Sequence, residues 1–185
     1  MLDLKLRLSE QKSFFNIIIY GHIQTKDYLR IDCKKLTFKF LLINLLSYKD
    51  QLLRKEDKLF DPIRKKWIVF TNEEFVRQLV ILDLIHRLHY GSGRIAVEKK
   101  LLVSDQLMRF DIVVFDQYAQ PYILIECKSF EVMLHDSAIY QAARYNMSLK
   151  APFVYITNGL RYQMAKVDFK ANSVFMIEDL PQNIN

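Results

Sequence analysis

Residues Tyr122 to Phe130 read YILIECKSF, an apolar run that ends in a carboxylate and an ammonium two residues apart. A short apolar run of this kind, preceded by a turn over 117–121, predicts a buried β-strand. Side chains alternate along a strand, so Glu126 and Lys128 share one face. We therefore expect the two charged groups to emerge side by side at the end of the strand, about 7 Å apart along the backbone.

The segment before it, RFDIVVFD over 109–116, supplies a further acid. Asp111 stands among apolar neighbours, where a carboxylate loses hydration unless another group interacts with it. If the two segments form a hairpin closed by 117–121, Asp111 lies opposite the Glu126 end. Two carboxylates and one ammonium would then face a common point.

Working outward, Thr71 and Glu74 form a capping box that predicts a helix over about 72–89. The helix is expected to stop at Gly91-Ser92-Gly93, and Asn158-Gly159 predicts a hairpin turn. The further expected elements are strands over 94–103, 109–116 and 122–129 in an antiparallel meander, a helix over 131–149, and a last strand over 173–177. This pattern predicts an α/β fold with a central sheet and helices on its faces.

The chain has 185 residues, half of them apolar, which suits one domain of ordinary size. We expect that domain over 41–185, with residues 1–40 as an N-terminal extension of uncertain structure. No apolar run reaches the length of a membrane span, and no secretory signal is visible, so a cytoplasmic location is expected. The net charge of +6 is typical of a chain kept soluble by its charge and does not by itself identify a nucleic-acid binder.

The two cysteines, Cys33 and Cys127, lack the spacing of a zinc site or a redox pair. Cys127 lies inside the expected core strand and is interpreted as a buried free thiol.

The residue types at the end of this strand suit metal-assisted phosphodiester hydrolysis. Asp111, Glu126 and the main-chain carbonyl of Cys127 are hard oxygen ligands of the kind that Mg²⁺ (or Mn²⁺) prefers. Lys128 could orient an attacking water or stabilise charge on the phosphate. The alternative is an ion network that only satisfies buried charges, because an isolated ExK pattern is common.

The ordered segments FDPIRKKWIVFTNEEFVRQ, IAVEKKL, RFDIVVFD, ILIECKS, QAARYN and APFVYITNG together resemble the PD-(D/E)xK nuclease superfamily. Within it, residues 42–185 are similar to the N-terminal nuclease domain of type I restriction enzyme R subunits. The resemblance implies a restriction-endonuclease-like three-layer α/β/α sandwich with a mixed sheet. It also implies a divalent-metal site at Asp111, Glu126 and Lys128. Gln141 and Tyr145 match the QxxxY pattern of the RecB-like branch, in which the Gln lies beside the active site.

The resemblance leaves two points open. The acid contributed by the first helix in this family could be Glu74, or Glu98 could take its place. The sequence also contains no GxxxxGK[ST] phosphate loop, whereas type I R subunits carry a helicase motor. DNA is the expected substrate, and protein partners are expected to supply the motor or the sequence specificity. The alternative is a catalytically silent nucleic-acid-binding or assembly module that retains the nuclease fold.

Overall fold

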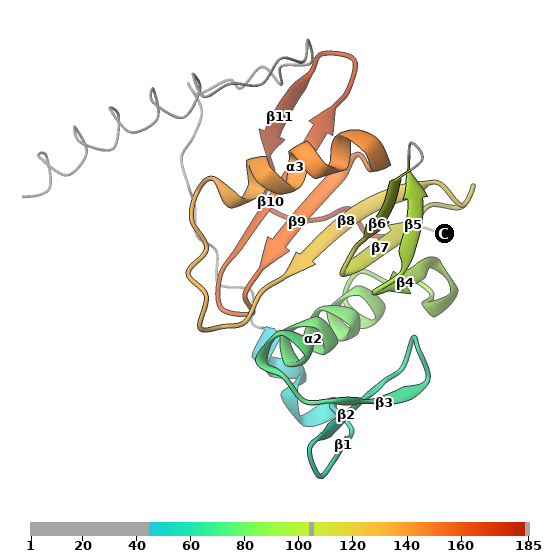
Figure 1. Ribbon diagram of the computed structural model, residues 1–185, viewed down its shortest axis with the longest axis vertical. Coiled ribbons are helices and arrows are strands. Elements are labelled where there is room, and N and C mark those ends of the chain that lie inside the picture. Colours follow the sequence, from blue (N-terminus) through green and yellow to red (C-terminus); the bar gives the residue numbers. More distant parts are fainter. Residues whose placement is uncertain (1–44, 104–105, 184–185) are drawn as a thin grey trace, which may run out of the picture.

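The computed structural model describes residues 45–103 and 106–183, and its elements are arranged as in Figure 1. They are, in chain order, η3 (Leu45–Gln51), β1 (Arg54–Lys55), β2 (Lys58–Asp61), β3 (Lys66–Val69), α2 (Asn72–His86), η4 (Ser92–Arg94), β4 (Ile95–Val97), β5 (Lys100–Val103), β6 (Gln106–Arg109), β7 (Ile112–Phe115), β8 (Pro121–Cys127), α3 (Ala138–Leu149), β9 (Phe153–Thr157), β10 (Tyr162–Asp168) and β11 (Ser173–Met176). The expected extension over 1–40, and Cys33 within it, lie outside the described residues. No helix among the described residues is long and apolar enough to cross a membrane.

A six-stranded sheet in the order β11-β10-β9-β8-β7-β4 forms the centre of the fold. β8 and β9 are parallel, and the other neighbouring strands are antiparallel. A parallel pair needs a long crossover connection, and α3 supplies it between β8 and β9. The predicted α/β class and the mixed character of the sheet are therefore confirmed.

The predicted meander is confirmed for β4, β7 and β8, which lie next to one another in antiparallel pairs. The prediction of a single strand over 94–103 is wrong, because the chain forms two strands there, β4 and β5, separated at Glu98. Glu98 has a φ of 48°, a left-handed conformation that a regular strand does not contain. The chain leaves the main sheet there, and β5 pairs with β6 in a separate hairpin.

Helix α2 covers one face of the central sheet (Figure 1). It begins as predicted, since the Thr71 hydroxyl accepts a hydrogen bond of 3.0 Å from the Glu74 N–H. The returning half of the expected capping box is absent, because the Glu74 carboxylate binds Arg64, Arg77 and Gln78 instead. The core on this face includes Leu79, Leu84, Ile112, Val114, Ile123, Ile125 and Tyr155.

Helix α3 covers the opposite face. It is shorter than the predicted helix over 131–149, because residues 131–137 form turns and irregular structure. Its buried side chains pack against β9 and β10, in a core that includes Ile139, Ala142, Ala143, Val154, Ile156 and Ala165. Successive residues of β8 follow the strand period, since Ile125 faces the α2 core and Leu124 faces the α3 side.

A second, small antiparallel sheet of β1, β2 and β3 lies beside α2 (Figure 1). Leu59 is buried, and the ring of Phe60 meets that of Trp67 in a T-shaped contact. The turn between β2 and β3 begins with Asp61, which is fully buried. This turn brings charged side chains up to the N-terminal half of α2, where they contribute to the site.

Candidate active site

The candidate site lies where β7 begins and β8 ends. Ile112 pairs with Ile125 in the antiparallel register, so Asp111, just before β7, lies beside Glu126. The main-chain N–H of Cys127 donates a hydrogen bond of 2.8 Å to Oδ2 of Asp111. The structure thus places Asp111 against the end of β8, the position expected from the hairpin.

Glu126 and Lys128 project from the same end of β8. Their charged groups form an ion pair with 3.7 Å between Nζ and Oε2. Lys128 is held in place through its backbone, because its N–H donates to the carbonyl of Thr157 on β9 at 2.8 Å. The structure therefore brings the three predicted groups, Asp111, Glu126 and Lys128, together at one end of the sheet.

The electrostatics of this cluster are those of a site with surplus negative charge. Burial, followed by the neighbouring Asp111 carboxylate, raises the pKa of Glu126 to about 7, and Lys128 offsets part of that shift. A raised carboxyl pKa means that the ionised form is poorly compensated in the protein alone. A cation beside Asp111 and Glu126 would supply the missing compensation.

Arg77 of α2 contacts the Asp111 carboxylate from the side of the helix. Its guanidinium is buried and donates to Oδ1 of Asp111 at 3.1 Å and to Glu73 at 2.8 Å. It also binds the Glu74 carboxylate and lies 3.5 Å from Oε1 of Glu98. Burial lowers the pKa of Arg77, but the carboxylates, Asp111 foremost, outweigh burial and raise that pKa above its ordinary value. Arg77 therefore stays charged and orients Asp111 from the helix side.

Arg64, in the turn between β2 and β3, binds the remaining acids of the network. Its guanidinium contacts Asp61 at 2.6 Å, Glu98 at 2.7 Å, and Glu74. The amide of Gln78 donates to Asp61 at 2.9 Å and to Glu74 at 2.8 Å. The buried carboxylates of Asp61 and Glu74 are thus paired with cations and amide donors, as buried charges must be.

The two candidates for the additional acid, Glu74 and Glu98, both belong to this arginine network. Glu98 binds Arg64, Arg77 and Arg109; burial raises the pKa of its carboxyl, but these guanidinium groups prevail and lower it. Each acid reaches Asp111 through Arg77 rather than through a direct side-chain contact among the described residues. The choice between Glu74 and Glu98 stays open.

Gln141 and Tyr145 lie on α3, one helical turn apart, and both are exposed. Within the described residues, the Gln141 side chain makes no hydrogen bond or ion pair with Asp111, Glu126 or Lys128. Its role beside the site stays a prediction.

The residues present fit a hydrated divalent cation better than a zinc ion. Among residues 45–103 and 106–183, no cluster of three or more His, Cys, Asp or Glu side chains has metal-binding geometry. The Cys127 thiol is buried as a free cysteine, and burial raises its pKa, so only its main-chain carbonyl is suited as a hard ligand. Mg²⁺ keeps several waters and binds proteins through one or two carboxylates, which Asp111 and Glu126 supply.

Sequence reasoning missed the role of Arg77 and Arg64. The signal for Arg77 was present in EEFVRQ, because Glu73 and Glu74 precede it by four and three residues on one helix face. The signal for Arg64 was weaker, since nothing local distinguishes it from the exposed Lys65 and Lys66 beside it. Besides Asp61, the partners of Arg64 are Glu74 and Glu98, which come from distant segments.

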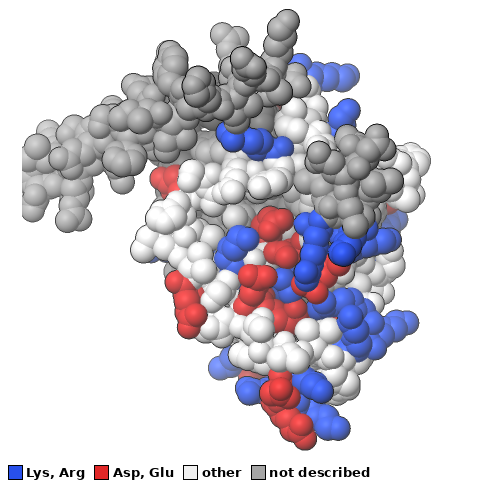
Figure 2. Space-filling view, in the orientation of Figure 1, with Lys and Arg blue, Asp and Glu red and all other residues white. Residues whose placement is uncertain are grey.

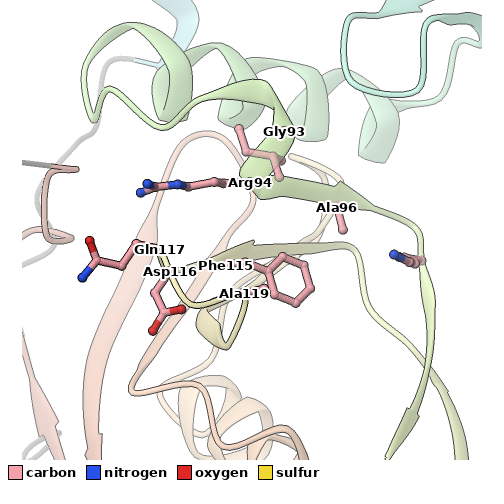
Figure 3. A pocket seen from close by; sticks show the side chains of 9 residues that line it. Gly93, Arg94, Ala96, Phe115, Asp116, Gln117 and Ala119 are labelled. Carbon is pink, nitrogen blue, oxygen red and sulfur yellow. The ribbon is translucent and has the colours of Figure 1, made fainter. Parts of the chain in front are cut away.

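Figure 2 shows carboxylates gathered at the centre of one face, between α2 and the end of β8, with Lys and Arg beside them. A cavity of about 470 Å³ lies toward the other end of β7, where its lining includes Arg94, Phe115 and Asp116 (Figure 3). Lys99, which follows Glu98 of the arginine network, also lines it. None of the predicted site residues lines that cavity. The acidic cluster, not the cavity, is the candidate active site.

The fold and the site define a mixed α/β domain with a charged, two-carboxylate centre at the end of an internal strand. A sequence model of the type I restriction enzyme R protein N terminus matches residues 72–181. The chain belongs to this family.

A fragment of a protein described as the HsdR subunit of a type I restriction enzyme from Vibrio vulnificus YJ016 is structurally similar, with a TM-score of 0.45 and 16% sequence identity. The similarity covers 60% of this chain and 24% of that chain. No curated protein matches the sequence.

Proposed function

We propose that this chain is a divalent-metal-dependent nuclease of the PD-(D/E)xK type that hydrolyses phosphodiester bonds in DNA. The observation that carries the proposal is the meeting of Asp111, Glu126 and Lys128 at the end of β8. Family membership supports it, because the family is that of type I restriction enzyme R proteins. The position of α2 and α3 on opposite faces of a mixed sheet supports a restriction-endonuclease-like three-layer sandwich.

In this proposal, Asp111 and Glu126, with the main-chain carbonyl of Cys127, hold Mg²⁺ or Mn²⁺. Such a cation, when bound, would supply a water of lowered pKa and would polarise the phosphate oxygens. Asp111 is oriented for this task by Arg77 and by the Cys127 N–H. Lys128, which is partly exposed beside Glu126, stabilises charge that develops on the phosphate. Gln141 supports the site from α3.

Translocation along DNA and recognition of a sequence would come from protein partners in a restriction-modification complex. The basis for this part of the proposal is the family match to the type I restriction enzyme R protein N terminus.

A catalytically silent binding or assembly module is the second candidate. One observation favours it: Arg77 already satisfies Oδ1 of Asp111, so one potential metal ligand has a cationic partner within the protein. Such a module would bind DNA without cutting it.

Cleavage of supercoiled plasmid DNA, with Mg²⁺ or Mn²⁺ and with EDTA, tests the proposal. Wild type should nick or linearise the plasmid only with metal, whereas Asp111→Asn and Lys128→Ala should reduce cleavage to background. Glu178→Gln, at an exposed position near the C-terminal end of the described chain, is the control and should cut as wild type does. Circular dichroism should show that all variants fold.

Thermal melting separates the two candidates. A metal that binds the folded state alone raises the melting temperature, so Mn²⁺ should stabilise wild type and leave Glu126→Gln unchanged. A wild type that binds DNA but is neither stabilised by Mn²⁺ nor able to cut would favour the silent module over the nuclease, because Arg77 would then occupy Asp111 in place of a metal.

A further inference from the structure

Two pairs of exposed lysines flank an ion pair beside the candidate site. Arg64 Nη1 contacts Glu98 Oε2 at 2.7 Å, which joins segments 34 residues apart in sequence. Lys65 and Lys66 directly follow the first partner, and Lys99 and Lys100 directly follow the second. The ion pair therefore brings the two lysine pairs into one neighbourhood of the surface.

The same neighbourhood borders Asp111. The N–H of Glu98 donates to the Asp111 carbonyl at 2.8 Å, and the N–H of Phe110 donates to the Lys99 carbonyl at 3.4 Å. The backbone that carries Lys99 thus runs alongside the backbone that carries the acid. Figure 2 shows Lys and Arg side chains along one flank of the central carboxylates.

The four lysines differ from the arginines around them in their freedom to bind a ligand. All four are exposed, and none of them forms an ion pair with another described residue. Arg64 is occupied by Asp61, Glu74 and Glu98, so it holds the two segments together but has little capacity for an external anion. The network thus joins the two segments that carry these lysines, and it contains more carboxylates than guanidinium groups, so it leaves negative charge that the lysines can offset.

An acidic centre alone repels a polyanion, so a substrate phosphate needs compensating positive charge close by. Lysine acts on phosphate as a point charge without base selectivity, which suits contact with a sugar–phosphate backbone. We propose that Lys65, Lys66, Lys99 and Lys100 form a phosphate-binding flank that holds the backbone of duplex DNA beside Asp111 and Glu126. This inference rests on the proposed function for its choice of DNA.

Binding of a short fluorescein-labelled DNA duplex to the full chain in EDTA tests the flank without any cleavage. The variants are Lys65→Gln/Lys66→Gln and Lys99→Gln/Lys100→Gln. The matched control is Lys166→Gln/Lys170→Gln, which removes the same charge from β10 and the turn after it. Fluorescence anisotropy at several salt concentrations gives Kd and its salt dependence.

Each flank variant should bind more weakly than wild type, and the negative slope of log K against log salt should become shallower by about 1.8, or 0.9 for each lost phosphate contact. The control should keep the wild-type slope. Flank variants that behave like the control, or a wild type that binds no duplex at low salt, would overturn the inference. Tighter binding of single-stranded RNA of the same length would overturn duplex DNA as the ligand.

The outcome is distinguishable from that of the cleavage experiment. Duplex binding that depends on these lysines, without cleavage in Mg²⁺ or Mn²⁺, would support the flank and refute the nuclease. Metal-dependent cleavage in variants that bind normally would support the nuclease and refute the flank.

Discussion

The Arg77 guanidinium donates to Oδ1 of Asp111 at 3.1 Å, while the Cys127 N–H donates to Oδ2 of the same carboxylate at 2.8 Å. One acid is thereby fixed from two directions, by the side chain of a helix and by the backbone of a strand. The packing of α2 on the sheet therefore helps to fix the orientation of the Asp111 carboxylate. Stability and site geometry are coupled through one buried cation.

Replacing Arg77 should destabilise the fold strongly. Arg77→Met removes the cation that contacts Glu74 and Asp111 and leaves this buried negative charge with less compensation. Breaking a buried ion pair from one side costs about 3–5 kcal/mol of unfolding free energy. Urea denaturation followed by circular dichroism would measure this loss.

Two further variants test whether the burial of the ion pairs causes the large loss of unfolding free energy expected for Arg77→Met. Glu73→Gln removes a half-exposed partner of the same arginine and should cost less than about 1 kcal/mol. In Arg77→Met/Glu74→Gln the second change removes one stranded charge, so the loss should be smaller than the sum of the two single losses. Additive losses would contradict a shared buried network.

The turn between β9 and β10 requires a glycine. Gly159 has a φ of +84°, and a Cβ placed there would lie 3.0 Å from a methyl carbon of Val76. Gly159→Ala should therefore cost about 1–2 kcal/mol of unfolding free energy, from the left-handed backbone and the contact with α2. Gly91→Ala is the control: its φ is −62° and nothing lies within 4 Å of an added Cβ. Equal thermal stability of the two variants would refute this explanation.

Period-two and turn signals predicted much of this fold correctly. The alternation in β8 predicted that Glu126 and Lys128 would emerge together, and the hairpin predicted that Asp111 would meet them. These features depend on residues close in sequence. The division at Glu98 was not predictable, because the left-handed residue is held by contacts with Asp111 and with distant arginines.

The buried arginine network escaped prediction for a related reason. Spacing along α2 shows that Glu74 and Arg77 share a helix face, but it does not show that this face is covered. The turn between β2 and β3 covers it, and that placement depends on tertiary packing. The spacing of apolar residues predicts which apolar side chains are buried. It does not predict that charged side chains such as Glu74 and Arg77 are buried against one another.

The Cys127 thiol should be dispensable for metal-dependent activity. Its side chain lies in the core on the α2 side, while its N–H holds Asp111 through the backbone. Cys127→Ala keeps that N–H and removes only the sulfur, so it should lower the unfolding free energy by about 1–2 kcal/mol and leave cleavage intact. Plasmid cleavage and urea denaturation of the same preparation would measure both. Loss of cleavage in a folded Cys127→Ala protein would assign the sulfur a direct role.

The stability of the metal-free protein should depend on pH through Glu126. Burial and Asp111 raise the pKa of this carboxyl from 4.5 to about 7 in the folded state. Between these values the folded protein binds a proton that the unfolded chain has released, so the unfolding free energy should fall as the pH rises from about 4.5 to about 7. Glu126→Gln should flatten this part of the curve. Lys128→Ala removes the cation that lowers the pKa and should steepen the curve or extend it to higher pH. Urea denaturation in EDTA at several pH values would measure these slopes, and a Glu126→Gln curve with the wild-type slope would show that another group titrates.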